Sequence, residues 1–112
     1  MMNTKTLTLP TAVTDYLAAA NRHDARGAAA CFAEDATVHD ENRDYRGRDA
    51  IRAWIEDTGR KYQPAFTLMR ATVRGDEISL SVAVAGRFPG SPVTLDYVLR
   101  LRADKIAELT IG

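Results

Sequence analysis

The chain contains a single cysteine, Cys31, so no disulfide can form within it. A secreted scaffold held together by disulfides is therefore excluded. Cys31 stands between Ala30 and Phe32 in an apolar run, and no basic residue flanks it to lower its pKa. This setting favours a small buried side chain over a nucleophile.

An excess of charge of one sign is also missing, because the 15 basic and 15 acidic residues cancel. A dedicated nucleic-acid-binding domain normally carries a basic excess or patch, so we expect no nucleic-acid partner. No apolar run approaches the roughly 20 residues that a membrane span needs, and Met1–Leu9 lacks the apolar core of a signal peptide. We therefore expect a cytoplasmic protein that does not enter a membrane.

The length of 112 residues suits one domain with one core. We expect a flexible N-terminal segment over residues 1–9 and a single domain over residues 10–112. The first half of this domain shows helical periodicity. Pro10 opens a first helix, and Asp24 is a suitable N-cap for a shorter one that extends to Phe32. The apolar stripe of the first helix consists of Val13, Tyr16, Leu17 and Ala20.

A short strand, Ala36–Asp40, is the only strand predicted in this half. Residues two apart on a strand share a face, so Asp40 should point to the core if Val38 does, and His39 should point away. A slip in register would exchange Asp40 and His39. The next residues, Glu41–Gly47, read as an exposed charged loop that could border a cavity. A third helix follows over residues 49–61, with Ile51, Trp54 and Ile55 on one face.

The second half alternates between apolar and polar residues with a period of two, as strands do. Four strands are predicted, over residues 66–74, 78–85, 93–102 and 106–111. Helices followed by hairpin-linked strands indicate an α+β fold with helices on one face of a curved antiparallel sheet. Such a fold has a pocket where the concave face does not fully meet the helices.

Five stretches resemble one known family. They are Tyr16–Asn21, His23–Asp24, Phe32–Val38, Gly47 and Ala50–Arg52. In these residues the chain is similar to the SnoaL-like and ketosteroid-isomerase-like branch of the nuclear transport factor 2-like superfamily. The resemblance implies a cystatin-like cone, in which three N-terminal helices pack on a curved antiparallel or mixed sheet that encloses a pocket. It does not select one activity, because this fold hosts isomerases, dehydratases, cyclases and non-enzymatic binders.

Ketosteroid isomerases use a tyrosine on the first helix, an aspartate base on the first strand and a protonated aspartate on a late strand. The resemblance puts Tyr16 at the position of the tyrosine and Asp40 at that of the base. At the third position the chain departs from the pattern, because Tyr97 replaces the aspartate. Asp96, one residue away, would need a bulge to point inward. A phenol at Tyr97 can still donate a hydrogen bond.

Each candidate also has a structural interpretation. Asp40 could pair with an arginine, and Tyr16 and Tyr97 could be core aromatics whose hydroxyls bond to backbone. If Asp40 does point inward beside apolar helices, its pKa should be raised, which suits proton abstraction. Further candidates for ligand contact are Trp54, Phe66, Met69, Phe88, His39 and Asp96. Aromatic or methionine side chains at such spacings are more often core residues.

Two functions follow from these residues. The first is a cofactor-independent isomerase, cyclase or dehydratase for a small apolar carbonyl compound, with Asp40 as general base and Tyr16, helped by Tyr97, as oxyanion donor. The alternative is a module of the same fold that binds a small molecule or dimerises without turnover. We expect no metal, because His23 and His39 are separated and have no carboxylate at ligand spacing.

Association of two copies is also expected. The strand over residues 78–85 should have an outer face of small residues, namely Ser79, Ser81, Ala83 and Ala85. Such a face suits packing of sheet on sheet, and relatives in this superfamily commonly form homodimers.

Overall fold

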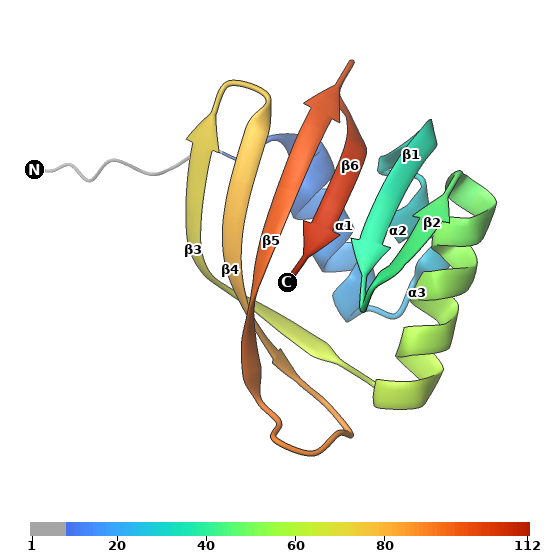
Figure 1. Cartoon of the computed structure of the whole chain (residues 1–112), viewed down its shortest axis with the longest axis vertical. Coiled ribbons are helices and arrows are strands. Elements are labelled where there is room, and N and C mark those ends of the chain that lie inside the picture. Colours follow the sequence, from blue (N-terminus) through green and yellow to red (C-terminus); the bar gives the residue numbers. More distant parts are fainter. Residues whose placement is uncertain (1–8) are drawn as a thin grey trace, which may run out of the picture.

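A six-stranded sheet is the framework of the computed structural model, which describes residues 9–112 (Figure 1). Its strands are β1 Phe32–Asp40, β2 Arg43–Arg46, β3 Ala65–Arg74, β4 Glu77–Ala85, β5 Val93–Arg102 and β6 Lys105–Ile111. They lie in the order β2-β1-β6-β5-β4-β3, and every neighbouring pair is antiparallel except β1 and β6. The sheet is therefore mixed. The N-terminal segment predicted to be flexible lies outside the described residues, apart from Leu9.

Three helices pack on one face of this sheet: α1 Thr11–Asn21, α2 Ala25–Ala29 and α3 Arg48–Tyr62 (Figure 1). Asp24 caps α2 as predicted, because its Oδ1 accepts a hydrogen bond from the Gly27 N–H at 2.9 Å. In residues 9–112, no helix is long and apolar enough to cross a membrane. Helices on one face of a mixed sheet confirm the predicted α+β class.

The prediction that the second helix extends to Phe32 is wrong. The helix ends at Ala29, and Phe32 is the first residue of β1. Phe32 pairs with Ile106 near the other end of the chain, and the Ile106 N–H donates to the Cys31 carbonyl at 2.9 Å. The fully buried Phe32 ring also meets Tyr16 edge to face, with ring centroids 5.4 Å apart. Pairing and burial here outweigh the helical propensity of the preceding alanines.

The prediction of a loop after β1 is also wrong, because residues 43–46 form β2. This strand pairs antiparallel with β1, and Arg43 lies opposite Asp40. Only Glu41 and Asn42 remain in the turn, both with positive φ, at 53° and 62°. Two successive residues with positive φ are typical of a tight type I′ hairpin. The turn directly follows Asp40 and so fixes where β1 ends.

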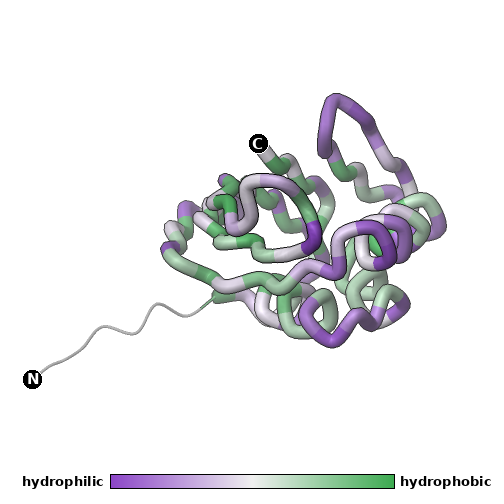
Figure 2. Tube along the Cα trace, turned by 90° about the horizontal axis from the view of Figure 1, so that it is seen from below, coloured by the Kyte–Doolittle hydropathy of each residue, from purple (hydrophilic) through white to green (hydrophobic). Residues whose placement is uncertain are grey.

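The core lies between the helices and the inner face of the sheet. The inner residues of β4 are buried, namely Ile78, Leu80, Val82 and Val84. The residues that alternate with them lie on the outer face, and they are the small residues predicted there: Ser79, Ser81, Ala83 and Ala85. Figure 2 shows the trace coloured by hydropathy, with hydrophilic stretches at several outer turns and hydrophobic stretches between them.

Candidate functional site

A cavity of about 1220 Å³ lies between the helices and the inner face of the sheet. Side chains from α1, α3, the β1–β2 hairpin and the strands β3 to β6 line it. Its aromatic lining residues are Tyr16, Trp54, Tyr62, Phe66, Phe88 and Tyr97. The volume and the apolar walls suit a small organic molecule.

Asp40 lies at the end of β1 and lines this cavity. Val38, two residues earlier, is fully buried, so the expected inward direction of Asp40 is what the strand alternation produces. The carboxylate accepts a hydrogen bond at Oδ2 from the Trp54 Nε1–H, at 3.1 Å. Burial raises the pKa of Asp40, the bond from Trp54 lowers it in part, and the neighbouring charge of Glu41 raises it again.

Tyr16 on α1 and Tyr97 on β5 line the same cavity, and each is only 3% exposed. Burial raises the pKa of both phenols, and the charge of Asp40 raises both further, so both remain protonated hydrogen-bond donors at neutral pH. Neither hydroxyl takes part in a side-chain hydrogen bond among the described residues, and neither is a fully buried oxygen without a partner.

Three predicted ligand contacts do line the cavity: Trp54, Phe66 and Phe88. Phe88 lies in the β4–β5 connection and meets Tyr62 at the end of α3 edge to face, with ring centroids 5.8 Å apart. The ring of Tyr45 on β2 stacks on Trp54 at 5.8 Å and 30°. The sequence gives no sign of this contact, because the segment around Tyr45 reads as a charged loop.

Three other predicted contacts lie elsewhere. Met69 is 62% exposed, because it lies three positions after the cavity-lining Phe66 and strand alternation turns it to the opposite face. It is also the extra residue of a bulge, since the register of β3 against β4 shifts between Leu68 and Arg70. Asp96 lies in a regular part of β5, so it alternates with Tyr97 and points outward. Its backbone pairs with Gly112 in both directions, at 3.0 and 2.9 Å.

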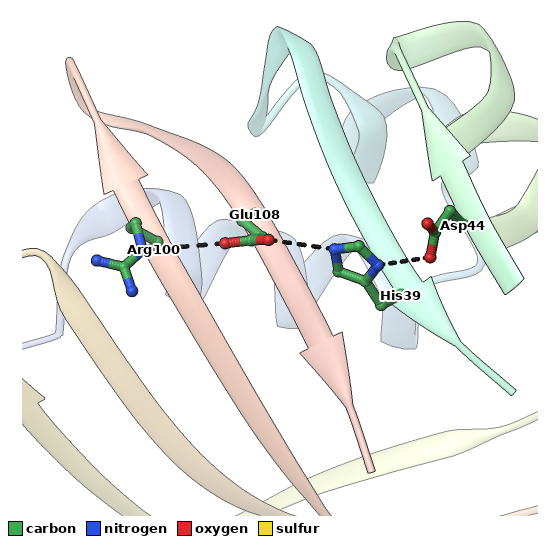
Figure 3. Close-up of polar contacts among 4 residues, drawn as sticks. All are labelled: His39, Asp44, Arg100 and Glu108. Carbon is green, nitrogen blue, oxygen red and sulfur yellow. Dashed lines mark hydrogen bonds and ion pairs between the residues drawn. The ribbon is translucent and has the colours of Figure 1, made fainter. Parts of the chain in front are cut away.

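His39 is the third of these residues and lies on the outer face of the sheet (Figure 3). Its Nδ1 lies 2.5 Å from Asp44 Oδ1 and its Nε2 lies 3.1 Å from Glu108 Oε2. Arg100 extends this row, with its Nε 3.9 Å from Glu108 Oε1. The hydrogen bond to Asp44 raises the pKa of His39, burial opposes this increase, and the contact with Glu108 adds to it. The side chain therefore cross-links β2, β1 and β6 and does not contact the cavity.

The described residues hold no group of three or more histidine, cysteine or acidic side chains that could bind a metal ion. The candidate groups of the site are the carboxylate of Asp40, the phenols of Tyr16 and Tyr97 and the indole of Trp54; the cavity is also lined by His23, Glu41, Glu56, Arg60 and Tyr62. The Trp54 indole donates a hydrogen bond to the Asp40 carboxylate, and the two phenols line the same cavity.

These features define a class of small α+β domains in which helices and a mixed sheet enclose a pocket. A model of the SnoaL-like domain matches residues 13–109, and the chain belongs to this family. The resemblance found in the sequence is thereby confirmed.

Among solved structures, the chain is similar to a candidate polyketide cyclase from Sinorhizobium meliloti, with 36% identity over 93% of this chain and 95% of that one and a TM-score of 0.90. A protein from Sphaerobacter thermophilus is 30% identical over 90% and 91% of the two chains, with a TM-score of 0.78. A protein with a ketosteroid isomerase-like fold from Catenulispora acidiphila, solved in complex with trimethylamine, is 24% identical over 94% and 86%, with a TM-score of 0.83. A comparison with curated proteins gives no match.

Proposed function

We propose that this protein is a cofactor-independent enzyme that moves a proton on a small apolar carbonyl compound, as an isomerase, cyclase or dehydratase. One observation carries the proposal: Asp40, Tyr16 and Tyr97 line the same apolar cavity. An acceptor that is poorly solvated and two donors that stay protonated are the groups that enolisation needs.

In the proposed reaction, Asp40 removes a proton from the carbon next to the substrate carbonyl. The electron pair moves to the carbonyl oxygen, and Tyr16 and Tyr97 donate hydrogen bonds to the developing oxyanion. Because burial raises the pKa of Asp40, its carboxylate is a stronger base than that of an exposed aspartate, and the carboxylic acid formed then returns the proton to another carbon of the substrate. The aromatic walls, including Phe66 and Phe88, would hold the apolar part of the substrate.

The alternative is a non-catalytic binding module. It is favoured by the third position of the site, where the phenol of Tyr97 replaces an acid and is the weaker hydrogen-bond donor. In this case the same cavity holds an apolar ligand, and Asp40 accepts a hydrogen bond from it.

Exchange of substrate C–H protons with deuterium, followed by NMR on a panel of small ketones, tests the chemistry without knowledge of the product. Ultraviolet absorbance of a β,γ-unsaturated ketone tests isomerisation in parallel. We expect Asp40→Asn to lose about 10²- to 10⁴-fold in rate. Asp96→Asn is the matched control, because it makes the same chemical change on the outer face of the sheet.

Equal rates for Asp40→Asn and the unchanged protein, with both folded, would refute the role of Asp40 as base. A co-purified ligand identified by mass spectrometry, together with no exchange on any ketone of the panel, would support the binding module instead.

We also propose that two copies associate through the outer face of the sheet. The small side chains of β4 on this face, Ser79, Ser81, Ala83 and Ala85, support close packing. Sedimentation that shows only a 12.3 kDa species at high concentration would contradict this. The single domain over residues 10–112, the cytoplasmic location and the lack of a nucleic-acid partner stay predictions from the sequence.

A further inference from the structure

Trp54 makes a contact with Asp40 that packing alone does not require. The indole lies on α3 and is 7% exposed, and its ring N–H donates to Asp40 Oδ2 at 3.1 Å. No other side chain among residues 9–112 donates a hydrogen bond to this carboxylate. A buried indole N–H needs a hydrogen-bond acceptor. Among the residues that line the cavity, its acceptor is Asp40, the carboxylate that acts as base in the proposed reaction.

The indole itself is held on two sides. Tyr45 of β2 stacks on its ring with centroids 5.8 Å apart. The start of α3 is tied to β1, because Arg48 Nε–H donates to the Phe32 carbonyl at 2.8 Å. The helix that carries Trp54 is therefore held against the strand that carries Asp40, and the stacked Tyr45 ring restricts rotation of the indole.

We propose that Trp54 is the positioning residue of the base: its N–H holds Asp40 Oδ2, fixes the plane of the carboxylate and leaves the other oxygen for the substrate. This inference rests on the function proposed above. A hydrogen bond to one oxygen also favours the ionised form, which is the form that can accept a proton. Trp54 would thus offset part of the effect that burial has on Asp40.

Other titratable groups also lie near Asp40 and could affect its pKa. Glu41 faces it from its own hairpin, and Tyr16 and Tyr97 face it from α1 and β5. His23, Glu56 and Arg60 line the same cavity from the α1–α2 corner and from α3. None of these is altered by a substitution at Trp54, so a shift seen in such a variant reports on the indole N–H.

The first test measures Asp40 directly and needs no substrate. In Trp54→Phe the ring remains but the N–H is lost, and we expect the titration midpoint of Asp40, followed by carbon-13 NMR of its carboxyl group, to move to higher pH. Ile55→Val is the control, because it alters a neighbouring lining residue that has no donor. A midpoint that stays in place or falls in folded Trp54→Phe overturns the proposal.

A second measurement uses tryptophan fluorescence and does not need the Trp54→Phe variant to fold. Trp54 is the only tryptophan of the chain, so the indole emission reports on the surroundings of this one side chain. We expect the emission of the unaltered protein to change with pH in step with Asp40, and this change to disappear in Asp40→Asn. Emission with the same pH dependence in both proteins overturns the contact.

The third measurement tests by enzyme kinetics whether the hydrogen bond between Trp54 and Asp40 affects catalysis. With any substrate that the exchange assay identifies, Trp54→Phe should reduce kcat by up to about 100-fold, leave KM nearly unchanged and move the acid limb of the kcat/KM profile to higher pH. An unchanged profile with substrate turnover intact overturns positioning while the base role of Asp40 stands. If no substrate is turned over, the proposed function fails, and the two spectroscopic tests still decide whether the contact tunes Asp40.

Discussion

Replacing Asn21 by alanine removes two hydrogen bonds between α1 and β3. Asn21 is the last residue of α1, and its side-chain amide meets the backbone of Phe66 at the start of an edge strand. Its Nδ2–H donates to the Phe66 carbonyl at 2.9 Å, and its Oδ1 accepts from the Phe66 N–H at 2.7 Å. The side chain of Phe66 lines the cavity, so this pair also fixes part of the cavity wall.

The expected loss of stability follows from these two bonds. Each is worth about 0.5 to 1.5 kcal/mol net, and because water can replace an exposed partner we take the lower half, about 1 to 2 kcal/mol for the pair. Unfolding entropy of about 2.1 cal/mol/K per residue gives about 0.24 kcal/mol/K for this chain, so the melting temperature should fall by about 4 to 8 °C. Differential scanning calorimetry measures this directly.

Asn21→Asp separates the two bonds. It keeps an acceptor for the Phe66 N–H but sets a carboxylate oxygen against the Phe66 carbonyl, at a helix C-terminus that already disfavours negative charge. We expect it to be at least as destabilising as Asn21→Ala at pH 7 and to recover as the pH falls and the carboxyl group gains a proton that it can donate. An Asn21→Ala protein that melts at the original temperature would refute the reasoning, as would an Asn21→Asp protein whose deficit does not depend on pH.

Three further predictions follow from single contacts. The pKa of His39 is raised, chiefly by Asp44, so its stabilising effect is complete below its ordinary pKa of about 6.5 and is lost as the pH rises through the higher folded value; the stability advantage over His39→Gln in denaturant melts should shrink over that range. The pKa of Asp40 is also raised, by burial, so ionising this carboxyl group costs stability above its ordinary pKa of about 4. In the same melts, Asp40→Asn should therefore gain stability relative to the unchanged protein as the pH rises above about 4, and the difference between the two should stay constant below that pH. A Cβ on Gly86 would lie 2.6 Å from the Tyr62 carbonyl oxygen, so Gly86→Ala should destabilise the fold by about 1 to 3 kcal/mol in the same melts, and an unchanged midpoint would show that the hairpin yields without cost.

The site could be predicted where it depends on position along one element. Tyr16 falls on the apolar stripe of a helix, and Asp40 shares a face of its strand with Val38; both line the cavity. In each case the direction of the side chain follows from a period of 3.6 or of two, which neighbouring residues already define. The choice between Tyr97 and Asp96 stayed open in the sequence, because a bulge would exchange them, and it is the regular pairing of β5 that turns Tyr97 inward.

The remaining features depend on residues far apart in the chain. Phe32 joins a strand because it pairs with Ile106, and the bulge at Met69 arises where β3 slips by one residue against β4. The hydrogen bond between Trp54 and Asp40 joins a helix to the end of a strand.

Local propensity and alternation therefore determined the α+β class and the direction of the residues proposed for catalysis. Only the tertiary structure decided the β1–β2 hairpin, the bulge and the indole that holds the carboxylate. The physical reason is that strand pairing and side-chain contacts between elements contribute free energy that no window of neighbouring residues contains. At such positions this energy exceeds the small local preferences of the chain.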